Sequence, residues 1–161
     1  MFSLLVNIPV NATRVQNGVT IAGGNWRGYA TNQLNEPHGL FVDDDQTVVI
    51  ADYMNHRIMQ WKNGDTTNGQ AVAGGNGEGD GLSQLNWPRY LFVDQDHSVY
   101  VSDRDNHRVM KWVEGAKESI VAAGGQGYGD ALTQLSYPNV LFVDTLGTLY
   151  VADLGNHRIM R

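Results

Sequence analysis

The chain has 161 residues, a mass of 17.8 kDa, a hydrophobic fraction of 42% and a formal net charge of −6. This length is that of one domain with a real core, and the acidic balance disfavours a polyanion such as nucleic acid as partner. The absence of cysteine excludes disulfides and thiolate chemistry, and no apolar stretch approaches the length of a membrane span.

The first 18 residues are expected to form a tail or a degenerate strand, and they show no signal peptide. The compartment, extracellular or cytoplasmic, therefore stays open. Residues 19–24 read Val-Thr-Ile-Ala-Gly-Gly and match Gln-Ala-Val-Ala-Gly-Gly at 70–75. Because 70–75 closes a repeat, we expect residues 19–24 to be an outer strand.

A repeat of about 50 residues then occupies the chain, with copies at about 34–75, 85–125 and 135–161. Equivalent prolines stand at 37, 88 and 138. Each copy predicts a first strand (40–42, 91–93, 141–143) and a second strand (48–51, 99–102, 149–152), both followed by aspartate. A third, alternating strand follows, and a fourth (71–73, 120–122) leads into Gly-Gly.

Four short strands per repeat, without helical periodicity, are typical of a β-propeller blade. The sequence therefore predicts an all-β fold of three four-stranded antiparallel blades in residues 19–161. Propellers have about four to eight blades, so three form an incomplete ring. Three outcomes remain open: an open arc, a piece of a larger protein, or a homodimer that closes a six-bladed ring.

The motifs Pro-x-x-Leu-Phe-Val-Asp, Tyr-Val-Ala-Asp and Asn-His-Arg-Ile/Val-Met resemble the NHL repeat. The resemblance implies a propeller that recruits a protein or RNA, as in tripartite-motif ubiquitin ligases, and the acidic charge makes RNA the weaker choice. Related propellers also include amidating lyases and gluconolactonase-like lactonases, which bind metal near the central axis.

The most regular polar residues recur once in every blade, so equivalent groups are spread around the ring instead of converging. We therefore expect an intra-blade polar network at buried strand ends, with no metal and no cofactor. These structural motif residues are Asp52, Asn55, His56 and Arg57; Asp103, Asn106, His107 and Arg108; and Asp153, Asn156, His157 and Arg158.

Functional residues are expected where the copies differ. The loops before the first strand and the turns before the Asn-His-Arg motif share one face, and repeat proteins commonly bind through such a face. The candidate binding face consists of His38, Tyr53, Met54, Arg89, Tyr90, Arg104, Asp105 and Asn139. Arginine and tyrosine are favoured at interfaces, so we predict a non-catalytic scaffold for a protein or peptide partner, with no catalytic residue.

Two alternatives stay open. The first is a metal-dependent lyase or lactonase of the amidating-lyase or gluconolactonase-like type, which requires ligands from several blades of a closed ring. The second is a truncated fragment of a six-bladed NHL protein without independent function. Fold alone does not decide among them.

Overall fold

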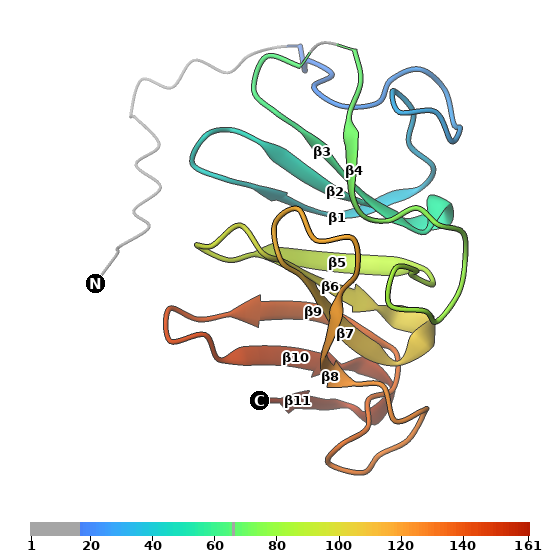
Figure 1. Ribbon diagram of the computed structural model, residues 1–161, viewed down its shortest axis with the longest axis vertical. Coiled ribbons are helices and arrows are strands. Elements are labelled where there is room, and N and C mark those ends of the chain that lie inside the picture. The colour runs from blue at the N-terminus through green and yellow to red at the C-terminus, as the bar shows by residue number, and fades with distance from the viewer. Residues whose placement is uncertain (1–16, 66) are drawn as a thin grey trace.

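The computed structural model describes residues 17–65 and 67–161 (Figure 1). The expectation for residues 1–18 falls almost entirely outside them. The described chain is all-β apart from three short 3-10 turns, each placed between the second and third strands of a blade: η1 (Tyr53–Asn55), η2 (Arg104–Asn106) and η3 (Leu154–Asn156). No helix in this part of the chain is long and apolar enough to cross a membrane.

The strands form three antiparallel sheets that follow one another along the chain. Blade 1 contains β1 (Pro37–Val42), β2 (Val48–Asp52), β3 (Arg57–Trp61) and β4 (Gln70–Gly74). Blade 2 contains β5 (Pro88–Val93), β6 (Val99–Asp103), β7 (Arg108–Trp112) and β8 (Ile120–Gly124). Blade 3 contains β9 (Pro138–Val143), β10 (Leu149–Asp153) and β11 (Arg158–Met160).

The predicted propeller architecture is confirmed, and the sheets do not close into a ring. Each of the first two blades has four strands, whereas blade 3 has three among the described residues. Residues 19–24, for which an outer strand is predicted, pair with none of the strands in residues 17–65 and 67–161. Figure 1 shows the blades stacked along the long axis, with β1, β5 and β9 succeeding one another.

The core lies between blades as well as within them. Leu91 and Val93 of β5 pack in one buried cluster with Val49 of β2 and Ile58 of β3. An equivalent cluster joins blades 2 and 3. Burial of such branched apolar side chains is the main force that holds neighbouring sheets together.

The inner strands also carry a row of phenylalanines. The ring of Phe92 lies 5.6 Å from that of Phe41 and 5.2 Å from that of Phe142, both in edge-on contact. This geometry is favourable for aromatic pairs. The row therefore packs each inner strand against the next and runs through all three blades.

Candidate functional site

A repeated polar network joins each blade to the loop that leads into it. In blade 2, Asp103 accepts hydrogen bonds from the Asn86 backbone N–H at 2.6 Å, from Asn106 Nδ2 at 2.8 Å and from Arg108 Nε at 2.6 Å. Both charged side chains are buried. A carboxylate in such surroundings requires these donors because burial would otherwise favour its neutral form.

The arginine of the network completes the connection. The terminal nitrogens of Arg108 donate to the backbone oxygens of Asp80, Gly81 and Gln84 at 2.7–3.3 Å. Asn106 donates to the oxygen of Gly79 in the same loop. One guanidinium group thus holds a loop more than twenty residues upstream through several hydrogen bonds at once. Arginine can do this, and lysine cannot, because the planar group of arginine carries five N–H donors in a fixed arrangement.

The other two blades repeat these contacts with their own residues. In blade 1 they are Asp52, Asn55 and Arg57, and in blade 3 they are Asp153, Asn156 and Arg158. Burial opposes ionisation of Asp153, but hydrogen bonds from Asn156, Ser136 and Arg158 hold the pKa of Asp153 below its ordinary value. In blade 3 the hydrogen bonds therefore favour the ionised carboxylate of Asp153, whereas in blade 2 the deeper burial of Asp103 raises the pKa of that carboxyl in spite of the same donors.

The motif histidines connect blades to one another. Each adopts a left-handed backbone with φ of 52–53° at the end of its 3-10 turn. His56 Nδ1 accepts the Trp87 backbone N–H at 3.3 Å, and His107 Nδ1 accepts that of Tyr137 at 3.2 Å. Burial lowers the pKa of His107, which suits an acceptor that must stay unprotonated.

No three of the metal-binding residue types His, Asp and Glu gather into a possible ligand set among the described residues. The motif aspartates instead meet asparagine and arginine of their own blade. The contacts of these aspartates are thus made within the protein itself.

The candidate binding face, called the variable face below because the three copies differ there, carries an aromatic row across blades 1 and 2. His38 stacks on Tyr53 with ring centroids 4.3 Å apart, and Tyr53 lies 5.6 Å from Trp87. Met54 is exposed on the same 3-10 turn. Trp87 was not among the predicted residues, although it stands directly before a repeat proline, where the copies differ.

Two arginines bring positive charge to this face. Arg104 lies 4.8 Å above the ring of Tyr137 and pairs with its neighbour Asp105. Burial lowers the pKa of His38, and the positive charges of Arg89 and Arg104 lower it further. Arg89 and Arg104 of blade 2 thus lie near enough to His38 of blade 1 for their charges to act on it.

Several polar atoms of this face lack partners. Among the described residues, five buried side-chain atoms have no hydrogen-bond partner, and three of them are Arg89 Nε, Arg104 Nε and Asn139 Oδ1. Buried polar atoms are normally satisfied, so these three atoms are available to bond with water or with a bound group. Tyr90, also in the predicted set, is partly exposed and lies against Gly39 of β1.

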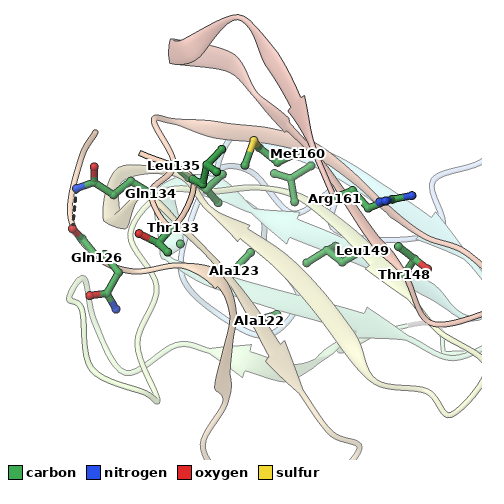
Figure 2. Close-up of a pocket in the computed structure, with 13 residues that line it drawn as sticks. Ala122, Ala123, Gln126, Thr133, Gln134, Leu135, Thr148, Leu149, Met160 and Arg161 are labelled. Carbon is green, nitrogen blue, oxygen red and sulfur yellow. Dashed lines mark hydrogen bonds between the residues drawn. The ribbon is translucent and has the colours of Figure 1, made fainter. Parts of the chain in front are cut away.

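A hollow of about 600 Å³ lies elsewhere, between β8 and blade 3. Figure 2 shows Ala123, Leu135 and Met160 around it, with Gln134 hydrogen-bonded to Gln126 at its rim. The corresponding position one repeat earlier is filled by the buried Trp112 and a cluster of apolar side chains. These side chains are Ala73, Leu85, Val99, Val101 and Met110. The hollow is therefore a packing position of the repeat, and its lining carries no catalytic constellation.

Comparison with known proteins agrees with this architecture. An auxiliary nutrient binding protein from Bacteroides thetaiotaomicron matches with a TM-score of 0.60 and 19% identity, over 77% of this chain and 36% of that one. A streptogramin B lyase matches with a TM-score of 0.55 and 12% identity, over 84% and 38%. Virginiamycin B lyase from Staphylococcus aureus matches with a TM-score of 0.53 and 14% identity, over 81% of this chain and 39% of that one.

These likenesses show the fold alone, and the chain spans less than two fifths of the length of each structure. The chain is thus a set of β-propeller blades. The family model described as NHL repeat matches residues 34–61, so the predicted resemblance is confirmed: the chain carries an NHL repeat in blade 1. No curated protein is significantly similar to the chain in sequence.

Proposed function

We propose that the chain is a non-catalytic binding module whose variable face receives a protein or peptide partner. The observation that carries the proposal is the concentration of arginine and aromatic side chains from neighbouring blades on one face, together with buried arginine nitrogens that have no partner. The few residues that dominate the binding energy of protein interfaces are enriched in tyrosine, tryptophan and arginine.

The charge of the face indicates the chemistry of the partner. Arg104 is paired with Asp105, whereas no carboxylate lies within 4 Å of Arg89 in the described part of the chain. A carboxylate on the partner would be the natural complement of Arg89, because arginine binds carboxylates through parallel hydrogen bonds. The aromatic row beside it offers flat apolar surface for a neighbouring side chain.

Selection from a phage-displayed library of random peptides tests the proposal. Peptides selected on the wild-type chain would be titrated calorimetrically against Arg89→Ala, Arg104→Ala and the control Lys117→Ala. Lys117 is exposed in the loop between β7 and β8, at the opposite end of the sheet. We expect the first two substitutions to weaken binding by about 30-fold. We also expect the selected peptides to be enriched in Asp or Glu.

Equal affinity for all variants, or failure to select any peptide, would refute the proposal.

The alternative of a metal-dependent lyase or lactonase has one supporting observation, namely that lyases are among the structural neighbours. It predicts metal in protein purified without chelator, measured by elemental analysis, and turnover in lyase or lactonase assays. A fragment without independent function predicts neither binding nor turnover.

A further inference from the structure

Blade 1 exposes a face that the other blades bury. Leu40 of β1 is 63% exposed, whereas its equivalents Leu91 and Leu141 are 6% and 5% exposed. In blades 2 and 3 these leucines pack into the clusters shared with the preceding blade. The side of blade 1 that corresponds to the contact with a preceding blade is thus exposed to water.

Blade 3 exposes the opposite face. Ile159 of β11 is 70% exposed, whereas its equivalents Ile58 and Val109 are fully buried. Ile58 belongs to the cluster between blades 1 and 2, and Val109 to the cluster between blades 2 and 3. The two open ends of the arc are therefore the two halves of the same blade-to-blade contact that the chain makes twice internally.

Residues 19–24 have the backbone of the end of an outer strand. Gly23 and Gly24 have φ of 67° and 83°, and the glycine pairs at the ends of β4 and β8 have φ of 65° and 81° and of 69° and 78°. The following loop also repeats, since the isolated parallel bridge between Arg27 and Leu34 recurs after β4 and after β8. The segment thus stands where the outer strand of a preceding blade would stand.

The strand edge that such a segment would join is free. β3 and β7 each pair with an outer strand, but β11 pairs only with β10 among residues 17–65 and 67–161. Figure 1 shows the first described residues at one end of the long axis and β11 at the other. One copy therefore does not bring its own segment 19–24 to its own β11.

We propose that a second copy of this chain covers both open faces and closes a six-bladed ring. Residues 19–24 of each copy form the outer strand of blade 3 in the other copy, and the two junctions are related by a two-fold axis. Six blades lie within the usual range for propellers. Closure removes the unpaired edge of β11, which is a hazard in any exposed sheet.

The repeat also supplies the register. In blade 1, Ile58 lies opposite Ala73, and Met59 lies opposite Ala71. Transferred to the junction, this pairing sets Ile159 opposite Ala22 of the other copy, and Met160 opposite Thr20. The same closure would bring Phe142 to Phe41 of the other copy, so the aromatic row of the inner strands would run around the whole ring.

Light scattering of the purified 161-residue chain across a dilution series is the first test, with an expected mass of twice 17.8 kDa. Ile159→Glu and Leu40→Glu each place a charge on one open face, and we expect them to raise the dimer dissociation constant by about 30-fold or more. Leu146→Glu is the matched control, because Leu146 is exposed in the turn between β9 and β10. Circular dichroism would verify that all variants fold.

A wild-type monomer throughout the series overturns the proposal, and it would indicate that further blades of a longer polypeptide cover these faces. A dimer that survives both face substitutions overturns it as well. A species that grows without limit as the concentration rises indicates open head-to-tail assembly in place of a closed ring.

A disulfide tests the strand exchange itself, since the chain has no cysteine of its own. We expect the double variant Ala22→Cys/Ile159→Cys to give a covalent dimer on a non-reducing gel, whereas either single variant gives none. Absence of the cross-link in a chain that is dimeric by mass refutes the exchange, and a ladder of covalent species refutes two-fold closure.

Discussion

Arg108→Ala is the most informative single change in the repeated network. It removes the bond from Arg108 Nε to Asp103 and the donors for three backbone oxygens of the leading loop. The remaining Asp103 is fully buried, so its charge would lose its counterion in low-dielectric surroundings. Removal of one partner of a buried ion pair costs about 3–5 kcal/mol, a large share of the roughly 5–15 kcal/mol that stabilises a domain.

Equilibrium unfolding in urea, followed by circular dichroism at fixed protomer concentration, would measure this loss. Arg104→Ala is the matched control four residues earlier, because its ion pair with Asp105 is only partly buried. We expect this control to cost about 1 kcal/mol or less. If Arg108→Ala cost no more than Arg104→Ala, the interpretation of the motif as a framework would fail.

Three further changes test packing and protonation. Burial lowers the pKa of His107 in the folded state below its ordinary value of 6.5, so the stabilisation from the neutral imidazole is complete above pH 6.5 and falls as the pH drops below it. Urea unfolding at pH values on both sides of 6.5 measures this dependence, and His107→Gln should flatten the profile of unfolding free energy against pH. Trp112→Ala should cost about 3–5 kcal/mol in the same assay, and a smaller loss than Val113→Ala would contradict its buried position. Gly39→Ala should cost about 1–3 kcal/mol, because the new Cβ would lie 2.9 Å from the Arg89 backbone oxygen; an unchanged unfolding midpoint would show that the inner strands can separate without cost.

The order and approximate positions of the strands can be predicted from the repeat, whereas the long-range polar contacts cannot. Strands were expected at 40–42 and 91–93, and the structure begins them at Pro37 and Pro88, with an irregular register after each proline. Apolar periodicity cannot reveal such a polar strand start. Nor can it reveal which loop Arg108 holds, because the bonded carbonyls lie 24–28 residues upstream.

The candidate face was predictable in part for a related physical reason. Divergence among the copies identified Tyr53 and Arg104, whose turns are equivalent. It also contained the signal for Trp87 and Tyr137, since blade 1 has Glu36 at that position. Their ring contacts with the candidate residues across the blade junctions depend on how far successive sheets are rotated, which cannot be read from one repeat.

The 3-10 turn of each blade and the strand after it place a candidate face residue and a network residue within a few positions of each other. In blade 2 the turn begins at Arg104, which lies on the variable face, and is followed by Arg108, which holds the buried network. In blade 1 the corresponding residues are Tyr53 and Arg57, with the same division between a face residue and a network residue. The outward position can therefore change from tyrosine to arginine while the inward bonds stay the same. The face on which we propose that a partner binds can therefore differ from blade to blade while the buried network stays the same, which is what the proposed function requires.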